Sequence, residues 1–222
     1  MIQLALFDID GTLFDTERLW AEALSLLMEE KGVRAKAQHL SEITYGLAWP
    51  DAFAALQRTY PRPLGDAHAT RFGQELCVIF DRLFSLAPPV IEGSVAILHR
   101  FRAAGIPCGY VSGSPRRTIE TNLRRCGLSD CFDLECSVPS DDAPRGKPFP
   151  DGYALAMERF GVPPEVTVAF EDSRVGATAA LTAGITTYVC PPPGAPEQTY
   201  PEGIRRLSDW SEALPLLFPD GK

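Results

Sequence analysis

The chain has 222 residues, enough for one large domain or two modest ones, and its 45% apolar and 23% charged residues are typical of a soluble globular protein. A net charge of −8 at pH 7 argues against nucleic-acid binding as its main task. The sequence has no apolar run of about 18 residues, so we expect no membrane span. Its first residues lack the features of a signal peptide, so we expect a cytoplasmic protein.

The six cysteines include no C-x-x-C pair, and several lie in apolar stretches. We therefore interpret them as reduced thiols of the core. The three histidines lie far apart and show no metal-binding spacing.

The first predicted element is a buried strand at residues 4–7, which is apolar and is ended by Gly11. Asp8 and Asp10 follow it. Because side chains two residues apart share a face, these carboxylates can point into one site at the end of the strand. Two neighbouring carboxylates repel each other, and a divalent cation would relieve that repulsion. The alternative is an ordinary polar strand end. A calcium loop is excluded, because leucines stand where it needs its glycine and its glutamate.

The following stretch has helical periodicity and no strand pattern. An apolar stripe predicts a helix at residues 17–31, with Gly32 as its C-cap. Three more helices are predicted to begin at Ser41, Pro50 and Asp66. Residues 16–87 are therefore predicted to form an all-helical cap domain inserted after the first strand.

After the connector at residues 87–89 the pattern alternates between strand and helix. The predicted strands are residues 106–111, 132–136, 166–170 and 186–190. The predicted helices are one capped by Ser94 that ends at Gly105, then one that starts at Ser114-Pro115 and ends before Gly127, then 151–161 and 173–184, and a last short one within 207–217. Five strands joined by helices predict an α/β, Rossmann-like parallel sheet with helices on both faces. Residues 1–15 and 88–222 would form this core domain.

Sites in open α/β sheets form at the carboxyl ends of the strands. Ser112 and Gly113 follow the second strand and lead into a helix. A hydroxyl and free N–H groups at a helix N-terminus suit a phosphate, although a Ser-Gly-Ser sequence is also common as a plain turn and cap. Lys147 stands between a glycine and a proline, where it can be held on an anion as a point charge. The alternative is a solvated lysine in a proline loop.

Glu171 and Asp172 follow the fourth strand at a helix entrance. Alone they are compatible with simple N-terminal helix charges. Beside Asp8 they would complete an oxygen-ligand site for Mg²⁺. These three acids alone would repel a phosphate, but Mg²⁺ and Lys147 would bring enough positive charge to make a phosphoryl group tolerable there.

Four motifs thus stand at the ends of successive elements, namely Asp8-Ile9-Asp10-Gly11-Thr12, Ser112, Lys147 and Glu171-Asp172. Together they resemble the motifs of the haloacid dehalogenase (HAD) superfamily, in the branch with a helical cap after the first strand. The sequences around Ser112 and Lys147 most resemble the sugar and polyol phosphate phosphatases of that branch.

The resemblance implies a Mg²⁺-dependent phosphatase that acts on a small phosphorylated metabolite in two steps. Asp8 would form an aspartyl-phosphate, and Asp10 would serve as acid and then as base. Mg²⁺ would be held by the Asp8 carboxylate, the Asp10 backbone carbonyl and Asp172, with Glu171 just outside the ligand set or an occasional ligand. The phosphoryl group would be held by Thr12, Ser112, Gly113 and Lys147. We expect a monomer or a weak homodimer.

Other members of the superfamily provide the alternatives. Dehalogenases lack the second aspartate, which is Asp10 here, and the phosphonate hydrolases need a cap lysine for which the candidates are Lys31 and Lys36. The closer alternative is a sugar phosphomutase of the β-phosphoglucomutase type. Those enzymes carry a histidine and a basic residue at cap positions where this chain has Trp20 and Trp49. A non-catalytic binding or regulatory protein on the HAD scaffold is a different class, which no missing motif residue supports.

The cap is expected to select the substrate. Glu17 and Trp20 lie soon after the first motif, and residues 45–49 form a plausible loop facing the core. Trp20 lies on the apolar side of its helix, which favours packing within the bundle. For Trp49 the sequence leaves packing and substrate stacking equally open.

Overall fold

The computed structural model describes residues 1–44, 49–64, 67–193, 195 and 197–219. The chain divides into two compact units, one of Met1–Asp15 with Val90–Lys222 and one of Thr16–Pro89. Within the described part of the chain, no helix is both long enough and apolar enough to span a membrane.

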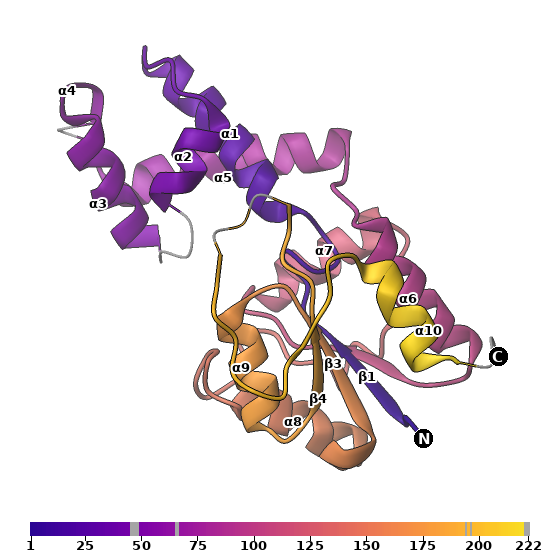
Figure 1. The fold of residues 1–222 in the computed structure, drawn as a ribbon. Coiled ribbons are helices and arrows are strands. Elements are labelled where there is room, and N and C mark those ends of the chain that lie inside the picture. The colour runs from indigo at the N-terminus through magenta and orange to yellow at the C-terminus, as the bar shows by residue number, and fades with distance from the viewer. Residues whose placement is uncertain (45–48, 65–66, 194, 196, 220–222) are drawn as a thin grey trace. The chain divides into compact units, whose positions relative to one another are not determined.

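The first unit is built on a five-stranded sheet with the strand order β2-β1-β3-β4-β5 (Figure 1). The strands are β1 (Leu4–Phe7), β2 (Cys108–Tyr110), β3 (Thr167–Glu171), β4 (Thr186–Val189) and β5 (Arg205–Arg206). Every pairing between them is parallel, which confirms the predicted sheet. The residues of β1 are all buried, because this strand lies between two others and is covered on both faces.

The predicted strand at residues 132–136 is wrong. A 3-10 turn, η1 (Ser129–Cys131), leads into bends there. The Cys136 N–H donates to the Asp133 carboxylate, and the Ser137 hydroxyl donates to the Asp133 carbonyl. Such local bonds give the backbone an alternative to a strand ladder. The fifth strand is instead β5, whose two exposed arginines carry no apolar pattern that would reveal a strand.

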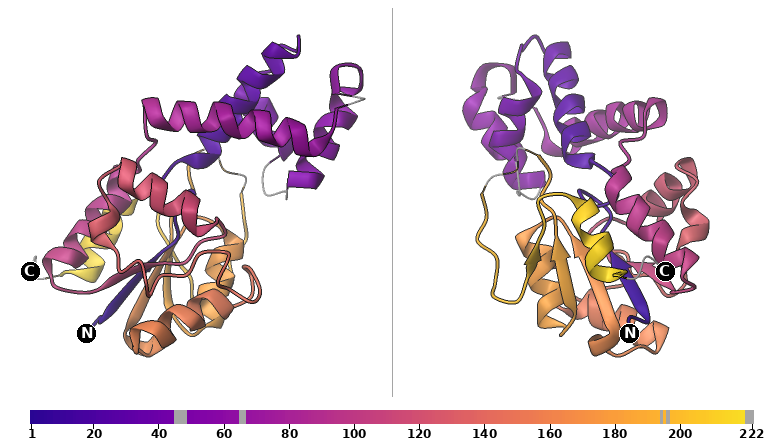
Figure 2. Two further views of the ribbon diagram at one scale, coloured as in Figure 1. Left: turned by 180° about the vertical axis from the view of Figure 1, so that it is seen from behind. Right: turned by 45° about the vertical axis from the view of Figure 1, so that its right-hand side comes forward.

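Helices cover both faces of this sheet. They are α6 (Glu92–Ala103), α7 (Arg116–Arg125), α8 (Asp151–Phe160), α9 (Arg174–Thr182) and α10 (Ala213–Leu217), with short turns η2 (Pro164–Val166) and η3 (Trp210–Glu212). In Figures 1 and 2, α8 and α9 lie on one side of the sheet and α6 and α10 on the other.

The alternation of side chains along the strands explains the two faces. Leu4 and Leu6 join a core cluster with residues of α8 and α9. Phe7 points the other way, stacks on Phe170 at a centroid distance of 4.6 Å, and meets Phe101 of α6. Both faces of β1 are therefore filled by apolar packing, which fixes the position of the residues that follow it.

The second unit contains only helices among its described residues. They are α1 (Thr16–Glu30), α2 (Ala37–Thr44), α3 (Trp49–Thr59), α4 (Pro61–Leu64) and α5 (Ala69–Leu86). Helix α1 packs against α2 and α5, and α3 packs against α2, α4 and α5.

Several predicted helix ends are shifted in the structure. Helix α2 begins at Ala37 rather than Ser41, and α5 begins at Ala69, while Asp66 lies outside the described residues. The last helical segment spans only residues 210–217. The helix predicted from Ser173 begins at Arg174, and Ser173 is its N-cap, because its hydroxyl accepts from the Gly176 N–H.

The predicted N-cap at Ser94 is wrong, because α6 begins at Glu92. The Ser94 hydroxyl is buried and donates to the carbonyls of Thr12 and Ile91. It therefore ties the chain after β1 to α6.

Replacing Ser94 with alanine should lower the free energy of unfolding by about 1–3 kcal/mol, because the buried Thr12 carbonyl loses this donor. The matched control is Ser85→Ala, which removes an exposed hydroxyl bonded within α5 and should change stability by less than about 0.5 kcal/mol. Urea unfolding of both variants tests this, and equal losses would contradict it.

Candidate active site

Three acids meet at the carboxyl ends of the two central strands. Asp8 follows β1, Glu171 ends β3, and Asp172 comes next. The register of the two strands pairs Phe7 with Phe170, so the acids emerge side by side. Oxygen atoms of the three carboxylates lie within 4.8 Å of one another, and all three residues are buried. The structure thus brings together the first and fourth predicted motifs.

Lys147 enters the same cluster. Its Nζ donates to Asp8 Oδ1 and to Glu171 Oε1, each at 2.6 Å. Burial lowers the pKa of Lys147, but the facing carboxylates of Asp8 and Glu171 more than offset this, so its pKa is raised. The ammonium group is therefore retained at neutral pH.

One lysine cannot neutralise this many acids. Burial raises the pKa of Asp8 most strongly, Lys147 opposes it, and Glu171 and Asp10 add to it, which brings the pKa to about 7. Burial and the neighbouring Asp8 and Glu171 raise the pKa of Asp172 well above its usual value. The cluster therefore favours any species that adds positive charge.

Two carboxylate oxygens of the cluster have no hydrogen-bond partner among the described residues. They are Asp8 Oδ2 and Glu171 Oε2, and both are buried. A buried charged oxygen without a partner is costly, so such atoms mark a place where another group binds. The all-oxygen donor set and the excess negative charge fit a hard divalent cation such as Mg²⁺.

Two glycines make room for the acids. Gly11 has φ +89°, and a Cβ atom there would collide with the Asp172 carboxylate. A Cβ atom on Gly176, in the first turn of α9, would collide with the Glu171 carboxylate. The backbone must approach both carboxylates closely, which only glycine permits.

Asp10 is not one of the three clustered acids, although its charge adds to the rise in the pKa of Asp8. Its Oδ2 accepts a hydrogen bond from Ser114 Oγ at 2.7 Å, and Ser112 Oγ lies 3.5 Å away. Ser112 Oγ in turn accepts from the Ser114 N–H. Sequence reasoning assigned Ser114 only to a helix start, although its place two residues after Ser112 at a strand end was a usable signal.

Tyr153 is a site residue that sequence reasoning missed. Its buried hydroxyl donates to Glu171 Oε1 at 2.6 Å, so this oxygen accepts hydrogen bonds from both Tyr153 and Lys147. Tyr153 lies in the first turn of α8, directly after the lysine loop. In the sequence Tyr153 looks like an ordinary core aromatic. The signal that could have found it was its position shortly after Lys147 in the chain.

The remaining predicted anion-binding residues lie near the same strand ends. Thr12 is fully buried, and its Oγ1 has no partner among the described residues. Gly113 is exposed, and a Cβ atom there would meet nothing within 4 Å.

The predicted cap residues lie in the helical unit. Glu17 is exposed near the start of α1, and Trp20 is half-buried and stacks on Phe80. Trp49 stacks on Phe72, and its indole N–H donates to the Ala69 carbonyl. Residues 45–48 of the predicted loop lie outside the described residues.

Known proteins are similar to this chain over most of its length. A family model for haloacid dehalogenase-like hydrolases matches residues 2–184. "Validoxylamine A 7'-phosphate phosphatase" of Streptomyces hygroscopicus subsp. limoneus is 31% identical over 196 residues, covering 83% of this chain and 84% of that protein. "Phosphorylated carbohydrates phosphatase" of Thermotoga maritima is 31% identical over 185 residues, covering 83% and 82%. The crystal structure of a HAD family hydrolase from Deinococcus radiodurans R1, with bound phosphate and sodium, superposes with a TM-score of 0.81 at 28% identity, covering 99% of this chain and 96% of that one.

Replacing Tyr153 with phenylalanine should lower the free energy of unfolding by about 1–3 kcal/mol, because the buried Glu171 loses a donor. Tyr110→Phe is the matched control. Its hydroxyl is also buried but has no partner among the described residues, so its removal should be neutral or stabilising. Urea unfolding compares the two variants, and equal losses would show that Tyr153 acts only by filling space.

Divalent-cation binding should depend on pH. Below pH of about 7 the metal-free folded protein holds a proton at Asp8, and a cation must displace it. The apparent dissociation constant for Mg²⁺ should therefore rise by up to about tenfold for each pH unit below about 7, per proton displaced. Calorimetric titration without any substrate measures this.

The stability of the metal-free protein should change with pH in the opposite direction to its Mg²⁺ affinity. Because the pKa of Asp8 is higher in the folded state, its contribution to stability is present below about pH 3.8 and is lost as the pH rises through about 7. A Mg²⁺ affinity that stays constant across this range would contradict the assignment of Asp8 to the cation site.

Proposed function

Because the chain belongs to the haloacid dehalogenase-like hydrolase family, we propose that it hydrolyses small phosphate esters of the sugar or polyol type through an aspartyl-phosphate. It is a phosphoric monoester hydrolase, as its relatives named phosphatases are. The observation that carries the proposal is the buried group in which Lys147 bridges Asp8 and Glu171 beside Asp172.

Asp8 is the proposed nucleophile. One of its oxygens is held by Lys147, which keeps the carboxylate oriented, while the other has no partner in the described part of the chain. An Asp8 oxygen attacks phosphorus, the ester P–O bond breaks, and the alcohol oxygen leaves. Water then attacks the phosphorus of the aspartyl-phosphate, releasing phosphate and restoring Asp8.

Asp10 is the proposed acid and base. In the first step its protonated carboxyl gives the proton to the leaving oxygen, and in the second it takes a proton from the attacking water. The hydroxyl of Ser114 donates to its carboxylate, and that of Ser112 lies beside it. The Asp10 side chain therefore has different hydrogen-bond partners from the three clustered acids, while its backbone carbonyl is a proposed ligand of the cation.

The residues present fit Mg²⁺. Asp8, the Asp10 backbone carbonyl and Asp172 would hold it, with Glu171 just outside the ligand set or an occasional ligand. When bound, the cation would neutralise charge that builds up on the phosphoryl oxygens. Lys147 supplies a fixed positive charge to the same oxygens, and Ser112, Gly113 and Thr12 supply hydrogen-bond donors. The unpartnered Thr12 hydroxyl supports this role.

Asp8→Asn should abolish phosphate release from p-nitrophenyl phosphate in the presence of Mg²⁺, because an amide is a far weaker nucleophile. Asp10→Asn should lower kcat by about 10²–10⁴-fold. It should also keep the fold, since an amide oxygen still accepts from Ser114. The control is Asp130→Asn, which changes an exposed aspartate and should leave kcat unaltered.

The same assay separates the alternative functions. A chelator should stop release, and added Mg²⁺ should restore it. Transfer of the phosphoryl group between positions of one sugar, without net release, would identify a phosphomutase instead. Full activity in Asp8→Asn, or none in the wild type on any of a wide panel of phosphorylated metabolites, would overturn the proposed function.

A further inference from the structure

Tyr153 connects the apolar core of the first unit to its acid cluster. The residue is fully buried and belongs to the same core cluster as Leu4 and Leu6 of β1. Its hydroxyl is directed out of this cluster and donates to Glu171 Oε1 at 2.6 Å. The contact lies wholly within the first compact unit. A residue that packs as a core aromatic therefore also contacts the charged group at the edge of the sheet.

Glu171 Oε1 accepts two short hydrogen bonds. The second donor is Lys147 Nζ, which lies 2.6 Å from Glu171 Oε1 and donates to Asp8 Oδ1 as well. The same ammonium nitrogen lies 5.6 Å from the centre of the Tyr153 ring. Because Lys147 is shared between two acids, Tyr153 is the donor that serves Glu171 alone among the acids of the cluster.

The other oxygen of this carboxylate, Glu171 Oε2, is buried and has no hydrogen-bond partner among the described residues. Glu171 also belongs to the group of three acids whose oxygens lie within 4.8 Å of one another. Since Oε1 already accepts from two donors, Oε2 is the oxygen of Glu171 that is left for a cation.

Helix α9 passes close to the Glu171 carboxylate. A Cβ atom placed on Gly176, in the first turn of this helix, would collide with both carboxylate oxygens. The Gly176 N–H donates to the Ser173 hydroxyl, which fixes this part of the backbone. The Glu171 carboxylate is thus confined by the backbone of α9 as well as by its two donors.

Such confinement affects similar cations differently. Mg²⁺ is small and requires a nearly octahedral set of six oxygens, whereas Ca²⁺ is larger, accepts six to eight oxygens and often binds both oxygens of one carboxylate. A carboxylate that can offer a single oxygen in a fixed direction suits Mg²⁺. A carboxylate that can turn and offer both oxygens suits Ca²⁺.

We propose that Tyr153 is a positioning residue that fixes the Glu171 carboxylate and thereby sets the preference of the site for Mg²⁺ over Ca²⁺. Without the hydroxyl, Oε1 keeps only Lys147 as a donor, so the carboxylate gains freedom to turn. Loss of a donor that orients a group at a metal site typically changes metal affinity by about 10–100-fold. The inference rests on the cation site of the proposed function and names the residue that makes this site selective.

Calorimetric titration of the metal-free protein with MgCl₂ and with CaCl₂, at a single pH, measures this preference. Tyr153→Phe keeps the ring and removes only the hydroxyl. It should raise the Kd for Mg²⁺ by about tenfold or more and change the Kd for Ca²⁺ by less than about threefold. An equal loss of affinity for both ions, or an unchanged ratio of the two constants, would overturn the proposal.

Tyr110→Phe is the matched control. Its hydroxyl is also buried, lies on β2 of the same sheet and has no partner among the described residues. The ratio of the two constants should therefore be the same in Tyr110→Phe as in the wild type. Circular dichroism at the titration temperature verifies that each variant is folded.

A second variant tests whether Tyr153 acts through Glu171. Glu171→Gln should by itself lower the preference for Mg²⁺, and adding Tyr153→Phe to it should change the ratio by less than about twofold more. An unchanged ratio in Glu171→Gln would overturn the proposal even if Tyr153→Phe did not fold. A further tenfold fall in the double variant would show that Tyr153 acts through another residue.

The titrations contain no phosphate ester, so they can fail independently of the proposed function. A selective loss of Mg²⁺ affinity in Tyr153→Phe, in a protein that releases no phosphate from any ester, would retain this inference and reject the proposed function. Phosphatase activity together with an unchanged ratio in Tyr153→Phe would reject this inference alone.

Discussion

The site depends on one electrostatic balance, in which a single buried ammonium group faces several buried carboxylates. Lys147 lies 2.6 Å from both Asp8 and Glu171, and Asp172 adds a further acid. Like charges at this spacing are tolerated only when something compensates them. The lysine compensates part, and the unpartnered oxygens of Asp8 and Glu171 show that more is needed. A divalent cation would supply the positive charge that the lysine alone does not provide.

The fold produces this balance by bringing distant segments to the same edge of the sheet. Parallel pairing aligns the ends of β1 and β3, so acids separated by more than 160 positions become neighbours. Close approach is then permitted by Gly11 and Gly176, where side chains would collide with the carboxylates. Tyr153, which lies on α8, completes the group, because its hydroxyl donates to the Glu171 oxygen that also accepts from Lys147. The chemistry is therefore a property of strand register and of two small residues, as much as of the acids themselves.

A part of the fold or of the site could be predicted where its signal lies in the local sequence. Apolar runs and the acids just after them mark strand ends within the sequence, so the sheet and the acids at its edge could be predicted. Tyr153 and Ser114 were missed. Their positions close to Lys147 and Ser112 in the sequence were usable signals, but no local pattern records the direction of their side chains, on which their importance depends. The expected strand at residues 132–136 failed because side-chain bonds at Asp133 favour a turn. Arg205 and Arg206 form a strand through pairing alone.

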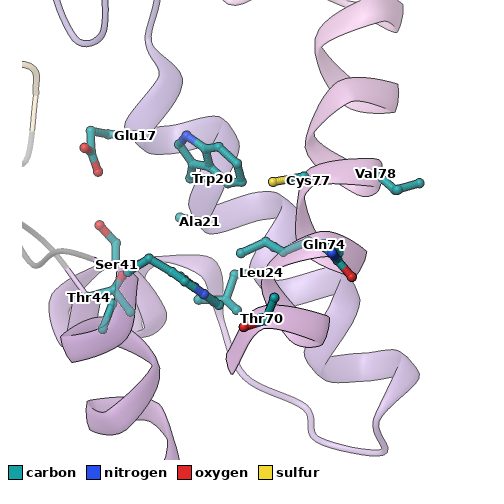
Figure 3. A pocket seen from close by; sticks show the side chains of 14 residues that line it. Glu17, Trp20, Ala21, Leu24, Ser41, Thr44, Thr70, Gln74, Cys77 and Val78 are labelled. Carbon is teal, nitrogen blue, oxygen red and sulfur yellow. The ribbon is translucent and has the colours of Figure 1, made fainter. Parts of the chain in front are cut away.

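Two sites of opposite character follow from this one chain. The acid and lysine group recognises charge and has no feature that would distinguish one alcohol from another, since its contacts are to oxygen atoms and to positive charge. The helical unit contains a pocket of about 860 Å³ between α1, α2, α3 and α5, which has apolar walls and is lined in part by the stacked indoles of Trp20 and Trp49 (Figure 3). Such a lining favours apolar surface over charge. Because the two sites lie in separate compact units, the side chains that line the pocket can change without disturbing the charge balance at the edge of the sheet.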